Sequence, residues 1–257
     1  MRGVTSLADQ VYVLRQKERD QVEVYDVINY CLQLRLTVPD VRGFTDMTSC
    51  EHCRCVYIAC TIAKCVNRLH AEGAATQWAV NDEPAGLSVN AAHNVLVTCR
   101  DVRKIKEFSS CGDLLRELTL PDDVINPHHA IQTRNGALIV CHGYLNDAVH
   151  RVCKISADGR HVIQSHGGQR GSDVGQYDVP RHLAVDNGFV LVVDVCNGRV
   201  TLLSPTLDYI GQVVSRDDLK DDPVRLCLDV QRRRLYVADN ECKDSRWVAG
   251  RVVVFGV

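Results

Sequence analysis

Aromatic residues and long hydrophobic runs are scarce in this sequence, and charge of one sign does not dominate it. Phe, Trp and Tyr make up 5% of the 257 residues, and the formal net charge is −2. This near balance removes the electrostatic reason to expect nucleic acid as a partner. No apolar run reaches the roughly 18 residues that a transmembrane helix needs, so we expect no membrane span.

Signals of secretion and of catalysis are also missing. Residues 1–10 lack the apolar core of a signal peptide, and we therefore expect a cytoplasmic protein. The sequence contains no G-x-S-x-G elbow, phosphate-binding loop, H-E-x-x-H motif or dinucleotide fingerprint. We assign no catalytic residue and expect no cofactor.

Cysteine, by contrast, is abundant, with 13 residues. Most lie in apolar runs, as Cys99, Cys141, Cys153 and Cys227 do, where a free thiol behaves as a small hydrophobe. The odd number and the missing secretory signal favour reduced thiols over a disulfide framework.

One stretch in the second half of the chain has the pattern of four consecutive short strands. Pro180 suits the start of a strand, because its ring fixes φ and it cannot donate to a ladder. Residues 182–186 form a short apolar run that ends at an Asn-Gly turn, and residues 189–193 are apolar throughout, as in a strand buried on both faces. Two further runs follow, at residues 199–203 and 209–214. Four short antiparallel strands in about 45 residues is the period of a β-propeller blade.

The same outline recurs along the whole chain. Innermost strands begin at six positions separated by 40, 43, 43, 53 and 43 residues: Gly3, Gly43, Gly86, His129, His182 and Arg225. Centres of the next strands recur with them, at Tyr12, Tyr57, Leu96, Ile139, Leu191 and Tyr236. The sequence therefore predicts an all-β fold, a six-bladed β-propeller of four-stranded antiparallel blades. We expect one domain over residues 1–257, with blades at about residues 1–39, 40–82, 83–124, 125–178, 179–221 and 222–257.

The last blade is expected to lack its outer strand, because its third strand already ends at Val257. This leaves an exposed edge beside residues 251–255. A strand from a partner, or from a second copy of the chain, could add to that edge.

Residues 22–36 also fit an amphipathic helix, with Val24, Ile28, Cys31 and Leu32 near one face. Their β-branched and aromatic content, and the register of the repeat, favour strands instead.

Residues 175–200 carry a motif that resembles the NHL repeat, a family named for its Asn-His-Leu signature. The shared features are Gly175-Gln176-Tyr177, Pro180, Val185-Asp186 and Asn197-x-Arg199-Val200. His182 departs from the family pattern, which usually has a small residue two positions after the Pro. The resemblance implies a rigid platform that holds a protein or RNA on its loop-bearing face. It also implies ion pairs between second and third strands, Asp194–Arg199 and Asp239–Arg251.

Three bulky polar residues, His129, His182 and Arg225, occupy the position at which the other blades have Gly. In a propeller this position lines the mouth of the central channel. We therefore expect these side chains, with the adjacent His128 and Arg181, to bind a ligand there. They could hold an anion or a metal; alternatively, they fill the channel and bond to water or carbonyl groups.

The resemblance extends to the lyase half of the peptide-amidating enzyme, in which channel histidines hold zinc. His129 and His182 match that arrangement as candidate metal ligands. Arg225 stands where a third His could sit, and no carboxylate is expected in the channel, so the metal site would be short of ligands.

The densest Cys/His cluster is Cys50, His52, Cys53 and Cys55. A tetrahedral zinc site uses four such ligands, usually as two separated pairs. This run has no second pair, so we favour a Cys-rich solvated turn on the face opposite the His residues.

Acidic pairs recur in the loops that join the blades, at Asp82-Glu83, Asp122-Asp123, Asp217-Asp218 and Asp221-Asp222. We interpret them as solvated charge; an acidic rim repels phosphate and disfavours RNA. The leading hypothesis is a non-catalytic binding platform for a protein with basic residues. The alternatives are a metal-dependent propeller enzyme of lyase or hydrolase type, with a His-lined channel, and an RNA-binding NHL domain.

Overall fold

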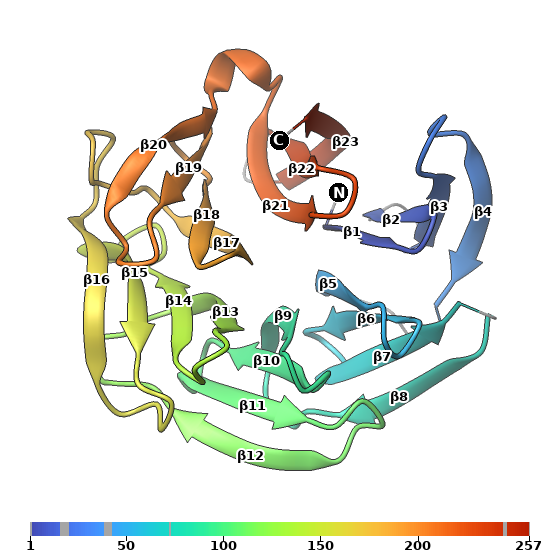
Figure 1. Ribbon diagram of the computed structural model, residues 1–257, viewed down its shortest axis with the longest axis horizontal. Helices are drawn as coiled ribbons and strands as arrows, with labels where there is room; N and C mark the ends of the chain where they lie inside the picture. The colour runs from blue at the N-terminus through green and yellow to red at the C-terminus, as the bar shows by residue number, and fades with distance from the viewer. Residues whose placement is uncertain (1, 16–20, 39–42, 72, 244–245, 257) are drawn as a thin grey trace.

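The computed structural model describes residues 2–15, 21–38, 43–71, 73–243 and 246–256. These residues form antiparallel sheets that are arranged in a ring around one axis (Figure 1). The first three sheets comprise β1 (Gly3–Leu7), β2 (Gln10–Arg15), β3 (Gln21–Asp26) and β4 (Leu32–Thr37); β5 (Phe44–Cys50), β6 (Cys55–Cys60), β7 (Cys65–His70) and β8 (Ala75–Ala79); and β9 (Pro84–Val89), β10 (Val95–Cys99), β11 (Lys104–Phe108) and β12 (Leu114–Thr119).

The other three sheets follow in chain order. They comprise β13 (Pro127–Gln132), β14 (Leu138–His142), β15 (Val149–Ile155) and β16 (Val162–Gln169); β17 (Pro180–Asp186), β18 (Phe189–Asp194), β19 (Arg199–Leu203) and β20 (Tyr209–Val214); and β21 (Asp222–Asp229), β22 (Arg234–Lys243) and β23 (Arg246–Gly256). The one helical element of the described residues is the short 3-10 turn Arg216–Asp218. The prediction of a six-bladed β-propeller is confirmed.

The innermost strands β1, β5, β9, β13, β17 and β21 contact one another in sequence around the axis, and β21 contacts β1 to close the ring. The cores lie between neighbouring blades. Ile139 and Val152 of the fourth blade, for example, pack with Leu183 and Val192 of the fifth. This explains why the second strands are mostly apolar, because each blade has a neighbour on both faces.

Residues 22–36 fall in β3, β4 and the turn between them, so the strand interpretation is confirmed over the helical one. No helix among the described residues is long and apolar enough to cross a membrane.

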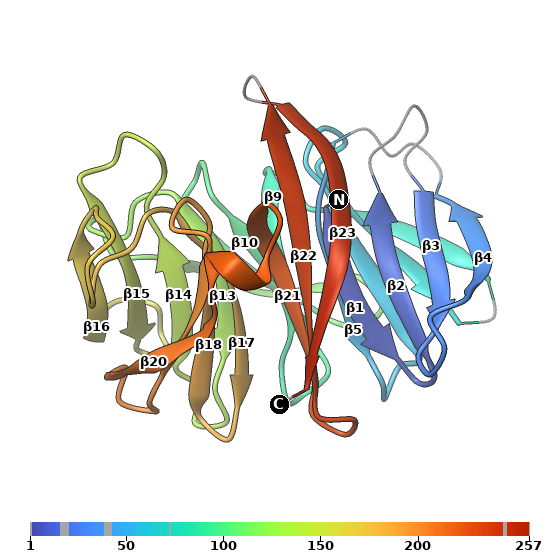
Figure 2. The ribbon, with the colours of Figure 1, turned by 90° about the horizontal axis from the view of Figure 1, so that it is seen from above.

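The sixth blade has three strands in the described part of the chain, as expected, and β23 is its outer edge. Figure 2 shows β23 with no strand outside it. Val254, on this strand, is 36% exposed. The predicted open edge beside residues 251–255 is therefore present.

One predicted repeat position is wrong. In the fifth blade Pro180 pairs with Asp194 and His182 with Val193. In the second blade Phe44 pairs with Cys60 and Asp46 with Ala59, so Asp46 is the equivalent of His182. Gly43, which the sequence comparison placed there, precedes β5 and has a φ of 84°. This blade has no Pro to mark where its inner strand begins, so the spacing of the repeat points to Gly43 instead of Asp46.

Candidate functional site: the mouth of the central channel

Five inner strands share a β-bulge at the same place, next to their first residue. The pairing shifts between Phe44 and Asp46, Pro84 and Gly86, Pro127 and His129, Pro180 and His182, and Pro223 and Arg225. A bulge adds one residue and re-aims the side chains beside it. The extra residues are Thr45, Ala85, His128, Arg181 and Val224, and the residues that follow the bulges are Asp46, Gly86, His129, His182 and Arg225.

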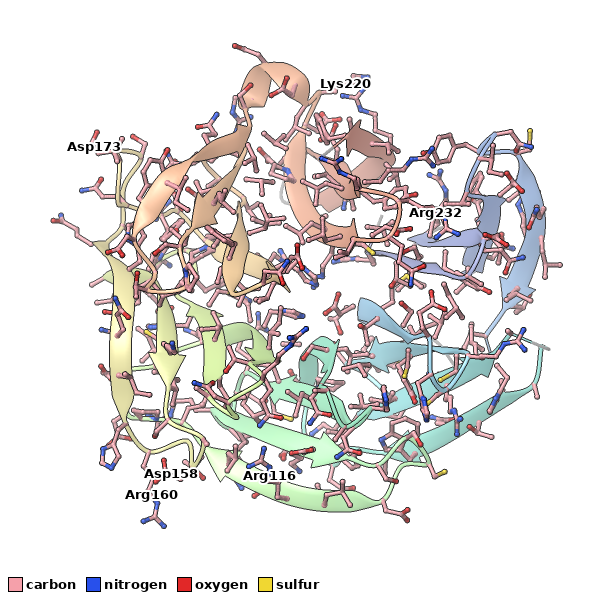
Figure 3. The ribbon with its side chains drawn as sticks, in the orientation of Figure 1. Arg116, Asp158, Arg160, Asp173, Lys220 and Arg232 are labelled. Carbon is pink, nitrogen blue, oxygen red and sulfur yellow. The ribbon has the colours of Figure 1, made fainter. Side chains whose placement is uncertain are left out.

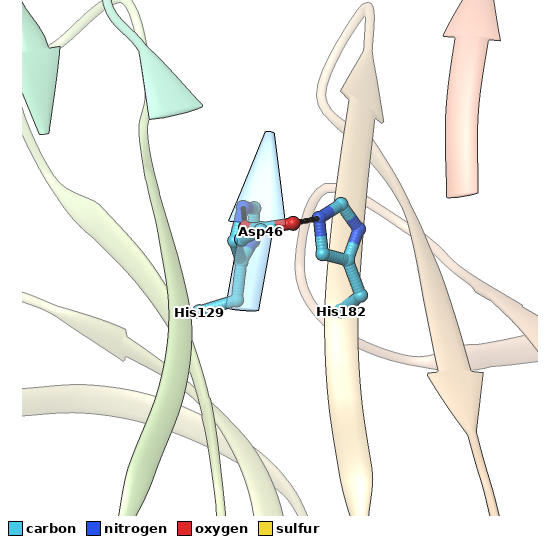
Figure 4. A group of neighbouring side chains, drawn as sticks. All are labelled: Asp46, His129 and His182. Atoms are coloured by element: carbon cyan, nitrogen blue, oxygen red, sulfur yellow. Dashed lines mark ion pairs between the residues drawn. The ribbon is translucent and has the colours of Figure 1, made fainter. Parts of the chain in front are cut away.

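Asp46, His129, His182 and Arg225 meet in the channel. Figure 4 shows the Asp46 side chain beside His129 and His182. Arg225 Nε donates to Asp46 Oδ1 at 2.8 Å, and the Leu87 N–H donates to Asp46 Oδ2 at 2.8 Å. His182 Nε2 lies 3.4 Å from Asp46 Oδ1, and His129 Nε2 lies 3.9 Å from Asp46 Oδ2. The side chains of Asp46, His129, His182 and Arg225 are all buried.

The charges of the group compensate one another. Burial alone would raise the pKa of Asp46, but the Arg225 guanidinium holds it below its usual value. Burial, with the neighbouring His182, lowers the pKa of His129 to about 3, and burial lowers the pKa of His182 as well. At neutral pH the group is therefore a charged Asp46–Arg225 pair beside two neutral imidazoles.

The two imidazoles stack, with centroids 4.0 Å apart and planes at 28°. His129 Nε2 lies 2.8 Å from the Leu87 carbonyl oxygen, which makes Nε2 the protonated nitrogen. His129 Nδ1 and His182 Nδ1 are buried without a hydrogen-bond partner, and His182 Nε2 has only its 3.4 Å contact with Asp46 Oδ1. Unsatisfied buried groups are costly and point to a ligand or water position.

Asp46, His129 and His182 also offer three ligand atoms that lie within 4.8 Å of one another. Two imidazole nitrogens and a carboxylate oxygen are a donor set that zinc accepts. The expectation that the channel has no carboxylate is therefore wrong. Arg225 already occupies Asp46 Oδ1, however, and would have to move before a cation could bind there.

A sequence signal for Asp46 was present. In the other five blades, the inner position and the centre of the next strand are 9 to 11 residues apart. Gly43 and Tyr57 are 14 apart, whereas Asp46 and Tyr57 are 11 apart. The outlying separation would have identified the error.

A hollow of about 50 Å³ opens on the channel beside this group. Its wall includes Thr45, Ala85, His128 and Arg181, the extra residues of four of the five bulges, and it also includes Glu83, Arg100 and Arg225. The predicted residues His128, Arg181 and Arg225 thus lie around one opening, while His129 and His182 are near Asp46 and do not line it. Arg100 was not predicted; it directly follows β10, and no motif marks it.

The Cys/His cluster lies at the other end of β5. Cys50 pairs with Cys55 across a tight turn, and the Cys53 N–H donates to Cys50 Sγ at 3.4 Å. His52 stacks on His93 at 4.0 Å instead of turning toward the thiols. Within the described residues, Asp46, His129 and His182 are the one group whose ligand atoms converge. None of the twelve cysteines whose side chains are described forms a disulfide.

Both implied ion pairs are present: Arg199 Nε lies 2.8 Å from Asp194 Oδ2, and Arg251 Nε lies 2.9 Å from Asp239 Oδ2. At least half of the eight acidic loop residues have a basic partner, in Asp82–Lys106, Asp122–Arg103, Asp123–Arg151 and Asp222–Arg216. Asp122, Asp123, Asp217 and Asp218 are exposed, as expected for solvated charge. The rim is therefore less acidic than the sequence suggested.

No protein-family model matches the chain, and no curated protein matches it in sequence. Solved structures do match it. A protein of unknown function from Bacteroides caccae has 15% identity and a TM-score of 0.69, covering 91% of this chain and 84% of that one. Virginiamycin B lyase from Staphylococcus aureus has 11% identity and a TM-score of 0.63, covering 100% and 84%. The Cps50 (Swd1) β-propeller domain of Myceliophteria thermophila has 8% identity and a TM-score of 0.61, covering 92% and 79%. At these identities the likeness shows the β-propeller fold alone.

Proposed function

We propose that this chain is a non-catalytic binding platform of NHL-like type, which holds a protein partner on its loop-bearing face and at the mouth of its central channel. The observation that carries the proposal is the convergence of polar side chains from several blades around one opening. These side chains project from inner strands of a closed ring, so their positions are fixed before a partner arrives. Pre-organisation of this kind lowers the entropic cost of binding.

The size of the opening favours a macromolecule over a small substrate. Drug-sized ligands occupy pockets of roughly 300–1,000 Å³. The hollow at the channel mouth measures about 50 Å³, which accommodates one functional group. The rest of the ligand must then lie on the surrounding loops, as a protein partner would.

Steric blockage of the mouth tests the proposal. Ala85 lines the hollow at the start of β9, and Ala91 is exposed in the turn beyond the other end of that strand. A partner captured with the wild-type chain is purified, and its affinity is measured by calorimetry for Ala85→Trp and Ala91→Trp. We expect Ala85→Trp to weaken binding at least tenfold and Ala91→Trp to leave it unchanged. Equal affinities for the two variants, or no partner at all, would contradict the platform.

A metal-dependent enzyme is the second candidate, and the Asp46, His129 and His182 ligand set favours it. Zinc content of the purified protein and calorimetric titration with Zn²⁺ decide between the two functions. The platform predicts sub-stoichiometric zinc and no tight binding. Stoichiometric zinc that His182→Ala removes, and that the exposed His161→Ala retains, would support the enzyme instead.

The open edge of the sixth blade supports a second contact, with another copy of this chain. Grooves of about 620 and 350 Å³ flank this blade: Leu228 and Val230 line the first with Phe189 of the fifth blade, and Val252 and Val254 line the second with Val11 of the first blade. Side chains of an added strand alternate between the two faces of a sheet and would enter both grooves. Residues 252–255 of β23 are apolar at every position. The same strand from a symmetric second copy would therefore supply apolar side chains to both grooves.

Sedimentation analysis over rising protein concentration tests this contact. We expect a dimer that Val254→Lys converts to a monomer and that Ile210→Lys, on the exposed outer strand β20, leaves intact. A wild-type monomer at every concentration would contradict self-association.

A further inference from the structure

We propose that the mouth of the central channel binds a carboxylate group, with the Arg181 guanidinium as its principal partner. This inference deepens the proposed platform function and rests on it, since the carboxylate would belong to the protein partner. Two sources share this chemistry, an acidic side chain and a C-terminal carboxylate.

Arg181 is a cation without a counter-charge. Its Nε is buried and has no hydrogen-bond partner, and no carboxylate among the described residues forms an ion pair with it. A guanidinium carries its charge at neutral pH, so this side chain is a cation whose Nε is buried and unpaired. Leaving a buried charged donor unpaired is costly, and an oxyanion at this point would remove that cost.

The neighbouring arginine shows what Arg181 lacks. Arg225 Nε donates to Asp46 Oδ1 at 2.8 Å, and its other nitrogens donate to the carbonyl oxygens of Val224 at 2.8 Å and Thr45 at 2.5 Å. The buried carboxylate of the channel is thereby already committed to Arg225. It cannot also neutralise Arg181.

The remaining charge around the hollow is positive in balance. Arg100, Arg181 and Arg225 line it, whereas Glu83 is the one carboxylate in its wall among the described residues. Arg100 lies over the Tyr144 ring, with Cζ 5.5 Å from the centroid, and Tyr144 also packs edge-on against His128. Asp46 neutralises Arg225, which leaves the guanidinium groups of Arg100 and Arg181 with Glu83 as the one carboxylate in the wall among the described residues.

His128 provides an independent sign of a missing ligand. The residue is 4% exposed and lines the hollow, and its Nε2 is buried without a hydrogen-bond partner. His128 and Arg181 are equivalent bulge residues of adjacent blades, so both project toward the opening. A group placed between them would meet one cationic and one neutral polar partner.

A carboxylate suits this opening in shape and in size. The guanidinium fork pairs with the two oxygens of a carboxylate in one plane, which adds geometric specificity to charge. A hollow of about 50 Å³ admits a group of that size but not the body of a ligand. Phosphate shares the charge but is larger, and it serves as the competing probe.

The test is a titration of the whole chain with small anions at constant ionic strength, chloride being replaced step by step. The probes are sodium acetate, inorganic phosphate, N-acetylalanine for a C-terminal carboxylate and the α-amide of N-acetylglutamate for a side-chain carboxylate. Binding is followed by the NMR signal of Arg181 Nε–H and by calorimetry. We expect a saturable shift with acetate and with one of the two amino-acid derivatives, which identifies the source.

Variants separate binding from folding. Arg181→Gln should weaken acetate binding at least tenfold and should raise the melting temperature of the free protein, because an uncompensated buried charge is removed. Arg181→Lys keeps the charge without the planar fork and should retain part of the affinity. Arg160→Gln, at the periphery of the fourth blade, should change neither quantity (Figure 3).

Acetate binding that Arg181→Gln does not weaken, or tighter binding of phosphate than of acetate, would overturn the carboxylate assignment. A partner blocked by Ala85→Trp but indifferent to Arg181→Gln would also overturn it and leave the platform standing. Acetate binding at Arg181 in a protein without any partner would contradict the platform alone.

Discussion

The fifth and second blades have the same strand framework but different chemistry at equivalent positions. In the fifth blade Asp194 pairs with Arg199 across β18 and β19, and the two side chains form an ion pair. In the second blade the same register brings together two buried thiols, Cys60 and Cys65. The blade geometry therefore does not depend on the charged pair. Packing between blades holds the framework, which leaves individual positions free to diverge.

The inner strands of these two blades differ in a way that matters for the site. His182 in the fifth blade and Asp46 in the second occupy equivalent positions and approach each other to 3.4 Å in the channel. Divergence between repeats has thus brought an acid, two imidazoles and a guanidinium to one point. A ring of identical blades could not produce this mixture.

The largest expected effect is the loss of stability when the Asp46 carboxylate, which the second blade contributes to the channel, is removed. Asp46→Ala leaves Arg225 buried without its carboxylate, and removal of one partner of a buried pair costs about 3–5 kcal/mol. Urea denaturation should show this loss in the free energy of unfolding. The double variant Asp46→Ala/Arg225→Met should recover part of it, and the exposed Asp173→Ala, far from the channel, should cost little (Figure 3). A loss from Asp46→Ala no larger than that from Asp173→Ala would show that the channel pair does not stabilise the fold.

The fifth blade could be predicted from the sequence, whereas the contribution of Asp46 from the second blade was not predicted. The fifth blade was predictable because Pro180, the Asn-Gly turn and the all-apolar run each report a local backbone requirement. The repeat spacing then predicted that His129, His182 and Arg225 occupy equivalent positions on three inner strands. Asp46 was missed because its blade lacks Pro and carries a glycine three residues earlier. Asp46 pairs with Arg225, whereas Arg181 has no such partner. Both facts depend on contacts between blades, which no local sequence pattern encodes.

The two buried carboxylates should respond to pH in opposite directions. Burial raises the pKa of Asp194 to about 6, despite Asn197 and Arg199. An unfolded Asp has a pKa of about 3.9, so the native state binds more protons between these values, and this group adds stability as the pH falls from about 6 to about 4. Asp46 has a lowered pKa instead, and its contribution is lost as the pH falls through its unfolded value.

Asp194→Asn isolates the first of these effects, because Asp46 and the histidines titrate equally in both proteins. The difference in unfolding free energy, wild type minus variant, should rise by up to about 1.4 kcal/mol for each unit that the pH falls in this range. Denaturant midpoints measured between about pH 4 and pH 6 provide the check, with Asp173→Asn as the control. A difference that shrinks with falling pH would show that Asp194 is a permanently charged partner of Arg199.

The smallest effect is expected from the second blade's thiol pair. Hydrogen bonding with Cys60 and burial raise the pKa of Cys65, so Cys65 is a neutral thiol that packs as a small apolar side chain. Cys65→Ala should cost only about 1 kcal/mol, the loss of a small buried group. A loss as large as that from Asp46→Ala would show that these thiols form an interaction essential to the blade.

The most direct test of the whole account is electron density at the channel mouth. A crystal structure of the purified chain grown in acetate should show a planar anion between Arg181 Nε and His128 Nε2, with Arg225 still paired to Asp46. A metal ion bound by Asp46, His129 and His182, with Arg225 turned away, would contradict the account and establish the channel as a metal centre.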